Sequence, residues 1–239
     1  MSSNRFPGKV LTEINGRPMI FWQVKRISNS KMIDKVVVAT SSDSSDDVLS
    51  EKLKTEGIIV HRGNLLDVHS RFIDVANEYP EFNTIVRLTA DCPLVMPEII
   101  DEMSAEFSRL NIDYLSNVNP ATFPDGLDVE IFRRNTLVTL NEYELDSKER
   151  EHVTLGIRNR PTRYKIMNFS QSIDLSLERW TVDYPTDLDF VKQVFSQFRG
   201  REESFSYLEL LAYFLPEYSD IPDYELNMVT QADLKLGSE

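Results

Sequence analysis

Two cations surround a Pro-Gly pair near the beginning of the sequence. Arg5 and Lys9 flank Pro7-Gly8. An arginine can bind phosphate oxygens in a bidentate manner, a lysine adds a mobile point charge, and a glycine lets the backbone approach an anion closely. The spacing of a Walker loop is absent. The segment therefore suits a polyphosphate, although a solvated turn is the better interpretation of these few residues in isolation.

Two aspartates follow predicted strands. Asp91 comes directly after the apolar run that ends at Thr89, and Asp183 lies between Glu178-Arg-Trp-Thr181 and Pro185. Carboxylates at the carboxyl edge of a sheet suit Mg²⁺, which commonly takes one or two carboxylates together with substrate phosphates. Each aspartate also has a simpler explanation. Asp91 could be a turn residue before a proline, and Asp183 on its own is better explained as the N-cap of a following helix.

A third polar group surrounds the glycine turn Pro124-Asp-Gly-Leu-Asp-Val-Glu130. Its acids are Asp125, Asp128 and Glu130, and His152 follows farther along with a carboxylate beside it in sequence. Such residues could bind a hydroxylated or anionic acceptor. The alternatives are a tight turn at Asp125-Gly126 and a hydrogen-bonding, partly buried role for His152.

Three weaker candidates complete the polar set. Ser41 ends a predicted strand and could hold a base or a ribose, or belong to the cap of the next helix, which we favour. Arg71 lies beside the apolar face formed by Phe72 and Val75. Arg87 stands within a buried-looking strand, so it requires a partner, either a structural acid or a ligand.

The overall composition excludes several function classes. The 239 residues carry 26 Lys and Arg against 39 Asp and Glu, a formal charge of −13, which argues against nucleic-acid binding. The longest purely apolar run, residues 210–215, is too short to cross a membrane. The single cysteine, Cys92, cannot form an internal disulfide and fits a reducing compartment. We therefore expect a cytoplasmic protein that contacts neither nucleic acid nor membrane.

Strands and helices must alternate to position these residues. β-Branched runs separated by apolar residues at helical spacing predict an α/β fold with a mostly parallel sheet, and some of the later strands could pair antiparallel. We expect one domain over residues 1–215 and a loosely packed acidic tail over residues 216–239. The predicted strands cover residues 35–40, 58–61, 84–89, 128–132, 164–168 and 178–181. The predicted helices cover residues 20–27, 68–79, 97–110, 185–198 and 205–215.

Taken together, the motifs resemble the cytidylyltransferase family, which includes the CMP-sialic acid and CMP-Kdo synthetases and, most similar, the spore-coat polysaccharide proteins. The resemblance spans about residues 1–199, and the combined pattern is far more specific than any single motif. The motifs are Arg5-Phe-Pro-Gly-Lys-Val-Leu11, Asn15-Gly-Arg-Pro18, Val37-Val-Ala-Thr40, Val86-Arg-Leu-Thr-Ala-Asp-Cys-Pro93, Pro124-Asp-Gly-Leu-Asp-Val-Glu130, Glu151-His-Val153 and Arg179-Trp-Thr-Val-Asp183.

This resemblance implies a Rossmann-like three-layer sandwich of the nucleotide-diphospho-sugar transferase type, with a small β region for dimerisation and acceptor binding. It also implies a reaction in which a sugar hydroxyl attacks the α-phosphate of CTP and pyrophosphate leaves. The implied nucleotide-binding residues are Ser2, Arg5, Lys9, Ser41, Arg71 and Arg87, with Arg5, Lys9 and Asp91 in catalysis. Asp91 and Asp183 would hold Mg²⁺, and Asp125, Asp128, Glu130 and His152 would face the acceptor. A homodimer is implied as well.

The sequence departs from the family in one respect. The family has a hydrophobic strand ending in an Ala-Arg pair before the segment that begins here at Met1. Without that central strand, we expect unpaired edges on its neighbours and the loss of one phosphate contact. We favour an internal methionine taken as the start. The alternative to this start is a protein that has lost catalysis. For the function itself, the alternatives are a catalytically impaired nucleotide-binding scaffold and a metal-dependent glycosyltransferase with a similar sheet.

Overall fold

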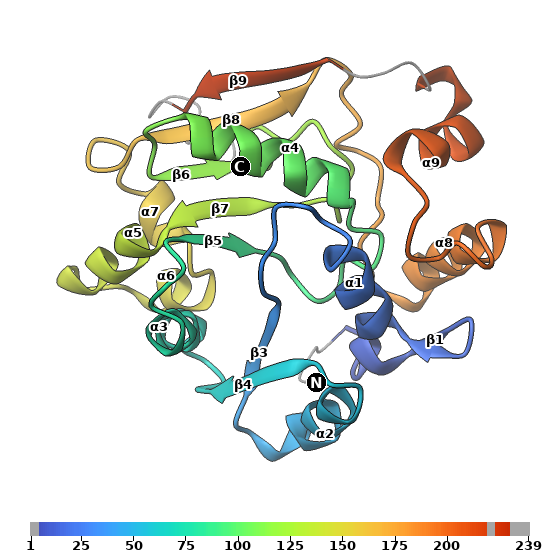
Figure 1. The fold of residues 1–239 in the computed structure, drawn as a ribbon, viewed down its shortest axis with the longest axis horizontal. Coiled ribbons are helices and arrows are strands. Elements are labelled where there is room, and N and C mark those ends of the chain that lie inside the picture. Colours follow the sequence, from blue (N-terminus) through green and yellow to red (C-terminus); the bar gives the residue numbers. More distant parts are fainter. Residues whose placement is uncertain (1–4, 219–222, 230–239) are drawn as a thin grey trace.

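The computed structural model describes residues 5–218 and 223–229 (Figure 1). Ser2, one of the predicted nucleotide-binding residues, lies outside the described residues. Within the described residues, no helix is long and apolar enough to span a bilayer.

The largest sheet has five strands in the order β5-β7-β6-β8-β9. β6 and β8 pair in parallel, whereas β7 pairs antiparallel with both β5 and β6, and β9 pairs antiparallel with β8. β5, β6 and β8 therefore share a direction, and β7 and β9 run against them. The strands are β5 (Thr84–Arg87), β6 (Tyr114–Ser116), β7 (Glu130–Arg133), β8 (Ile166–Gln171) and β9 (Tyr224–Met228).

A second, separate sheet contains only β3 (Val37–Ser41) and β4 (Ile59–Gly63), which pair in parallel. A short hairpin of β1 (Glu13–Ile14) and β2 (Arg17–Pro18) precedes the first long helix. The strand–helix–strand alternation of the first half is as predicted.

Helices cover both faces of the sheets (Figure 1). Adjacent strand residues point to opposite sides: Leu115 and Ile131 pack into the core cluster that contains α4, while Tyr114 and Phe132 pack into the cluster that contains α3, α5 and α7. The helices are α1 (Met19–Ile27), α2 (Asp47–Thr55), α3 (Val68–Glu78), α4 (Pro97–Arg109), α5 (Arg134–Thr139), α6 (Ser147–Glu151), α7 (Leu155–Arg158), α8 (Pro185–Gln197) and α9 (Tyr207–Phe214). Short 3₁₀ turns are η1 (Lys9–Leu11), η2 (Ser44–Asp46), η3 (Leu140–Glu142) and η4 (Pro216–Tyr218).

Three expectations from the sequence are corrected. Residues 178–181 form no strand, because only the single bridge between Asp125 and Arg179 is present there. The pairings of the main sheet are mostly antiparallel, because β7 is inserted between β5 and β6. Part of the expected loose tail is ordered, because β9 pairs along all of its length with the edge of β8.

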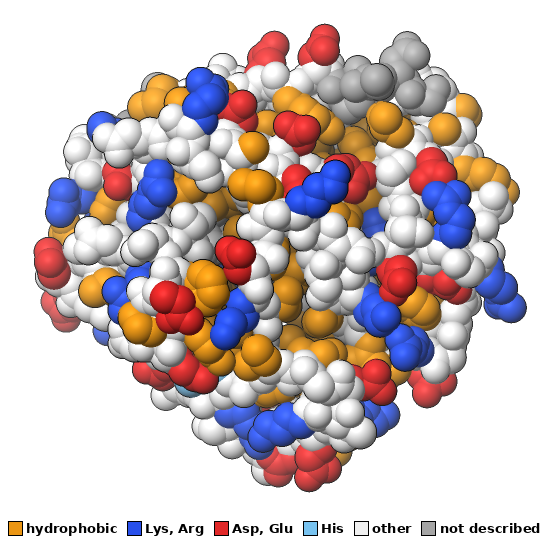
Figure 2. All heavy atoms as spheres, in the orientation of Figure 1, with side chains coloured by type: hydrophobic (Ala, Val, Ile, Leu, Met, Phe, Trp, Pro, Cys, Tyr) orange, Lys and Arg blue, Asp and Glu red, His pale blue; other side chains and the backbone are white. Residues whose placement is uncertain are grey.

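A cavity separates the two sheets between β3 and β5. Its volume is about 730 Å³, and both strands line it. Apolar side chains are visible in a hollow near the centre of the face shown in Figure 2. The cavity lies where the sequence comparison with the family predicts unpaired strand edges, and among the described residues β3 and β5 have no strand partner on this side.

Candidate active site

The central feature of the site is one lysine between two carboxylates. Lys9 Nζ lies 2.9 Å from Asp91 Oδ2 and 2.9 Å from Asp183 Oδ1. The three residues come from distant parts of the sequence and meet here, as their motifs predict. Lys9 is 9% exposed as a whole residue, so its charge is largely withdrawn from water and depends on these two partners.

Local backbone structure explains this convergence. Gly8 has a φ of 73° and precedes η1, so the chain turns and directs Lys9 inward. Asp91 follows the end of β5. The backbone amide of Val182 donates to the carbonyl of Asp91 over 2.8 Å, which holds the segment carrying Asp183 against the edge of the sheet.

Two arginines extend the charged group outward. Arg5 Nη2 lies 2.9 Å from Asp183 Oδ1 on the exposed side. Arg179 contacts Asp125 at 2.8 Å and lies 3.6 Å from Asp183 Oδ2. Acids and cations therefore alternate along the site, and the cations offset part of the repulsion among the carboxylates.

Asp183 is not the N-cap of α8, as its position before Pro185 had suggested. The N-cap is Tyr184, and Asp187 in the first turn of the helix accepts from the backbone amides of Asp183 and Tyr184, each over 2.9 Å. The side chain of Asp183 is thereby left to face Lys9 and Arg5.

The pKa shifts of the central pair favour the charged state of each group. Burial raises the pKa of Asp91, but hydrogen bonds from Lys9 and Thr89 outweigh it, and the net pKa is below the usual value. Burial lowers the pKa of Lys9, but the two carboxylates outweigh it and the net pKa is raised. Both groups therefore stay ionised across the neutral range.

A divalent ion would find two carboxylates here and no third. Among residues 5–218 and 223–229, no group of three or more His, Cys, Asp or Glu side chains has metal-binding spacing. Two carboxylates that converge on one cationic atom nevertheless match the oxygen donors that Mg²⁺ takes when phosphates complete its coordination. The residues present fit that ion.

A polar pocket of about 250 Å³ adjoins the end of β5. It contains three of the four predicted acceptor residues, Asp128, Glu130 and His152. Asp125 does not line it and instead pairs with the exposed Arg179. The remaining lining residues are Arg87, Thr89, Val118 and Arg158.

Glu130 is held by partners within the protein. Arg87 forms an ion pair with it, Tyr114 Oη donates to it over 2.6 Å, and the hydroxyl of Thr154 donates to the same oxygen. Burial raises the pKa of Glu130, but Arg87 and these hydroxyls lower it below its usual value. The sequence did not decide whether Arg87 pairs with a structural acid or with a ligand. In the structure its partner is a structural acid, Glu130.

Asp128 has the opposite environment. Burial and the neighbouring carboxylates of Asp125 and Glu130 raise its pKa to about 6. Among the described residues, no side-chain cation hydrogen-bonds to it. Asp128 can therefore change its protonation state near neutral pH.

Two further predicted nucleotide residues have clear positions. The hydroxyl of Ser41 donates to Asp46 Oδ2 over 2.6 Å, so it is engaged with an internal acid. Arg71 packs against Gly63, where an added Cβ would lie 2.6 Å from Arg71 Cγ. The Nε of Arg71 is buried without a hydrogen-bond partner in the described part of the chain.

Comparison with known proteins identifies the family. A cytidylyltransferase family profile matches residues 1–224. This chain belongs to the cytidylyltransferase family. The spore coat polysaccharide biosynthesis protein SpsF of Bacillus subtilis is 32% identical to this cytidylyltransferase over 218 residues, which cover 88% of this chain and 89% of SpsF.

Other similar proteins agree with this assignment. A cytidylyltransferase of Leptospira borgpetersenii has a TM-score of 0.85 and 32% identity, with 92% of each chain covered. A 3-deoxy-manno-octulosonate cytidylyltransferase of Leptospira interrogans is 32% identical over 104 residues, 44% of this chain and 41% of its own. The CMP:2-keto-3-deoxy-manno-octonic acid synthetase solved with CTP has a TM-score of 0.63 at 16% identity, covering 82% of this chain and 95% of its own, and supports the fold alone.

The sequence of this cytidylyltransferase did not indicate that two arginines, Arg179 and Arg158, belong to the site. Arg179 was part of a motif, but its position among Asp125, Asp183 and Asp187 had no local signal. Arg158 lines the polar pocket from α7, and its Nε is buried without a partner among the described residues. Its only sequence signal is an arginine after an apolar helical pair, which many surface helices share.

Proposed function

We propose that this cytidylyltransferase joins CMP from CTP to a sugar acid and releases pyrophosphate. The observation that carries the proposal is the contact of Lys9 with both Asp91 and Asp183, directly beside a polar pocket of about 250 Å³. The first feature has the charges needed for a metal-bound triphosphate, and the second has the size and polarity of a site for a small hydroxylated acceptor.

On the nucleotide side, Arg5 and Lys9 would contact phosphate oxygens of CTP. Arg5 is half-exposed at the outer end of the site, where its guanidinium can exchange Asp183 for a phosphate. Asp91 and Asp183 would hold Mg²⁺ between them. When bound, this ion supplies neutralisation of charge on the phosphate oxygens. Transfer at phosphorus depends mainly on such positioning and charge compensation.

On the acceptor side, Asp128 is suited to hold a proton. Its pKa of about 6 lies close to working pH, so its carboxylate can accept the proton of an attacking hydroxyl and release it again. Arg87 and Glu130 form a fixed pair in the pocket wall, while His152 is exposed at the pocket and can contact the acceptor. Asp125 stays a proposed acceptor contact, and its ion pair with Arg179 must break before it can contact the acceptor.

We further propose that the product enters a surface polysaccharide or glycan, since SpsF shares most of its length with this chain. A homodimer and a cytoplasmic location also stay predictions. Sedimentation of the purified protein would test the dimer.

The test is release of pyrophosphate from CTP in the presence of Mg²⁺ and a panel of sugar acids. We expect release with CTP that requires at least one sugar acid and stops when a chelator removes Mg²⁺. ATP, GTP and UTP are the matched controls. Release with another nucleotide but not CTP would overturn the nucleotide choice.

The second candidate function is nucleotide binding without turnover. The cavity of about 730 Å³ between β3 and β5 favours it, because within residues 5–218 and 223–229 no strand pairs with β5 on the side that faces this cavity. Calorimetric binding of CTP without pyrophosphate release for any acceptor would support this candidate over the transferase.

A further inference from the structure

The loop that carries Asp91 is buried but has neither helical nor strand structure. It runs from the end of β5 to the start of α4, over residues 88–96, and we call it the Asp91 loop. Its residues Leu94, Val95 and Met96 are each 2% exposed or less. A buried backbone without regular structure must pair its carbonyl groups with other parts of the chain. The position of Asp91 therefore depends on the groups that contact this loop.

Two side chains of α1 hold the Asp91 loop, one on each side of the aspartate. Gln23 Nε2 donates to the carbonyl of Thr89 over 2.6 Å. Arg26 Nε donates to the carbonyl of Val95 over 2.8 Å. The two side chains are three residues apart, so they lie on the same face of the helix. One helix face therefore spans the loop from before Asp91 to after it.

The same helix is fixed to the segment that carries Lys9. The backbone amide of Met19 donates to the carbonyl of Thr12 over 2.9 Å. Trp22 Nε1 donates to the carbonyl of Ile14 over 2.7 Å. Thr12 in turn closes η1, since its amide donates to the carbonyl of Lys9 over 3.0 Å. α1 consequently connects the lysine of the candidate active site with the loop of one of its two carboxylate partners.

Arg26 is fully buried and uses its charge on backbone groups. It is 0% exposed, and its Cζ lies 3.8 Å from the ring centre of Phe205. Burial lowers the pKa of Arg26 to about 10, so the guanidinium stays charged at neutral pH. A planar guanidinium presents its donors in a fixed geometry, so it determines where the accepting groups lie. The acceptors are the carbonyls of Val95, Glu202 and Phe205 and the sulfur of Met96.

We propose that Arg26 and Gln23 are positioning residues of the candidate active site, which hold the Asp91 loop against α1 so that the carboxylate of Asp91 reaches Lys9. The effect extends to Asp183, because the amide of the preceding residue donates to the carbonyl of Asp91. In the hydrogen bonds and ion pairs of the described residues, neither side chain touches these three charged groups. The catalytic meaning of this arrangement rests on the proposed function, whereas the geometry around Lys9 can be measured without it.

The test compares Arg26→Met with Arg133→Met. Arg133 is a matched control, because its guanidinium also donates to three backbone carbonyls and lies over a phenylalanine ring. It pairs with Thr84, at the end of β5 away from Asp91. Each substitution leaves buried carbonyls without a donor, so we expect both to lower the Tm. Only Arg26→Met is expected to change the site.

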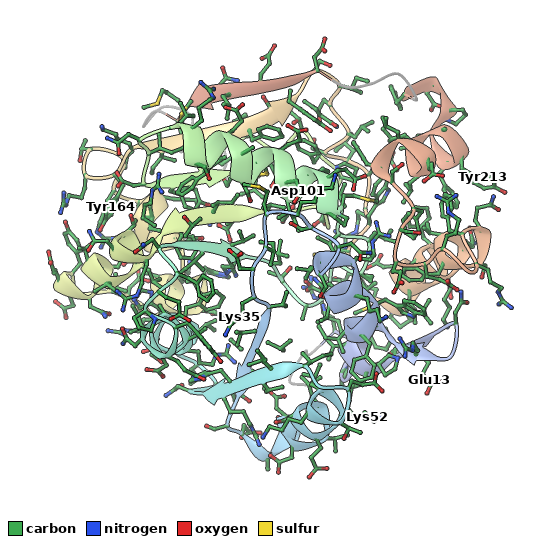
Figure 3. The ribbon with its side chains drawn as sticks, in the orientation of Figure 1. Glu13, Lys35, Lys52, Asp101, Tyr164 and Tyr213 are labelled. Atoms are coloured by element: carbon green, nitrogen blue, oxygen red, sulfur yellow. The ribbon has the colours of Figure 1, made fainter. Side chains whose placement is uncertain are left out.

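The first readout is the rate at which acetic anhydride acetylates Lys9, followed by mass spectrometry well below the Tm of both variants. Lys52, on the exposed side of α2, is the internal reference (Figure 3). Lys9 reacts slowly in the unmodified protein, because it is buried and protonated between two carboxylates. We expect Arg26→Met to raise the rate at Lys9 relative to Lys52 by at least ~10-fold, since a carboxylate partner is lost. Arg133→Met should leave the ratio unchanged.

The second readout is the Mg²⁺ concentration that half-saturates pyrophosphate release. We expect Arg26→Met to raise it by ~10-fold, as is usual when a group that orients a metal-binding carboxylate is removed. Arg133→Met should leave it unchanged. If the unmodified protein releases no pyrophosphate, the proposed function fails, and the acetylation of Lys9 still decides the role of Arg26.

Arg26→Lys replaces Arg26→Met if the latter does not fold. It keeps the charge but loses the planar arrangement of donors, so acetylation of Lys9 should change in the same direction. An acetylation rate at Lys9 equal to that of the unmodified protein would overturn the proposal. An equal increase in Arg133→Met would overturn it as well, because Arg26 would then contribute to stability alone.

Discussion

Asp91 and Asp128 lie beside the same end of β5 and differ in their partners rather than in their chemistry. Asp91 has Lys9 Nζ at 2.9 Å, and its pKa lies below the usual value. Asp128 has Asp125 and Glu130 as charged neighbours, and its pKa is raised to about 6. Burial disfavours the charged form of both, so the neighbouring charge decides the outcome.

The difference divides the site into two functions. The Lys9 side maintains fixed negative charge, which suits the binding of a metal-nucleotide. The Asp128 side can exchange a proton near neutral pH, which suits contact with a hydroxyl group. The following variants test whether the partners maintain this division.

Lys9→Met has the largest expected effect, because it removes the buried cation that Asp91 and Asp183 share and leaves only exposed arginines beside Asp183. We expect pyrophosphate release to fall by at least ~10²-fold. The free energy of unfolding should fall by about 3 kcal/mol. The loss should be similar from about pH 5 to 9, since Asp91 has a lowered and Lys9 a raised pKa and both stay charged there.

Lys25→Met, in an exposed pair with Glu203, is the control for both assays. Unchanged activity in Lys9→Met would remove the basis of the proposed nucleotide side.

Asp91→Asn should have the next largest effect, because it keeps the shape but removes one carboxylate. Titration of activity with Mg²⁺ should show a half-saturating concentration raised by at least ~10-fold. Asp174→Asn, a change to a surface carboxylate that accepts from the backbone amide of Ser176, should leave this concentration unaltered. An unchanged Mg²⁺ requirement in Asp91→Asn would place the ion elsewhere.

Asp128→Asn should stabilise the protein at pH 7.5. The folded pKa of about 6 exceeds the unfolded value of about 3.8, so the folded state binds the proton more tightly and its stability rises as pH falls from 7 to 4. At pH 7.5 the ionised carboxylate costs on the order of 1–3 kcal/mol, which the variant removes. At pH 4 the advantage should vanish. Thermal unfolding at both pH values measures this, with the exposed Asp189→Asn as control. An advantage that grows toward pH 4 would contradict the assignment.

Arg179→Ala should have the smallest effect, although Arg179 contacts three carboxylates. Its side chain is 46% exposed, so water and salt screen these pairs. We expect the free energy of unfolding to change by less than ~1 kcal/mol in urea titrations, with a smaller change at high salt. A loss as large as that of Lys9→Met would show that the outer arginine, not the buried lysine, maintains the acids.

The sequence predicts the parts of the fold that have strong local patterns. The runs at β3, β4 and β5 are continuous and β-branched, and they were found within a few residues. β6 was missed because three residues, Tyr114-Leu-Ser116, are too few to show a period. β9 was missed because Tyr224-Glu-Leu-Asn-Met228 is polar enough to resemble a tail, and pairing with β8 decides its structure.

The candidate site follows a similar division. The convergence of Lys9, Asp91 and Asp183 could be predicted, because carboxyl ends of neighbouring strands share one edge of a sheet. The choice between cap and site residue at Asp183 could not, since the helix begins one residue later, with Tyr184 as its N-cap, and the side chain of Asp183 meets Lys9 from a distant part of the sequence. The pairing of Arg87 with Glu130 depends on the register of β5 with β7, which no local pattern encodes.

The short strand β5 borders three different spaces. Thr84–Arg87 lines the cavity between β3 and β5, Arg87 enters the polar pocket, and the chain continues from it to Asp91. A substitution in β5 must therefore be compatible with the cavity, with the polar pocket and with the position of Asp91. Over evolutionary time these four positions should consequently drift together rather than one at a time, and compensating changes should be sought in α1, α3 and β7.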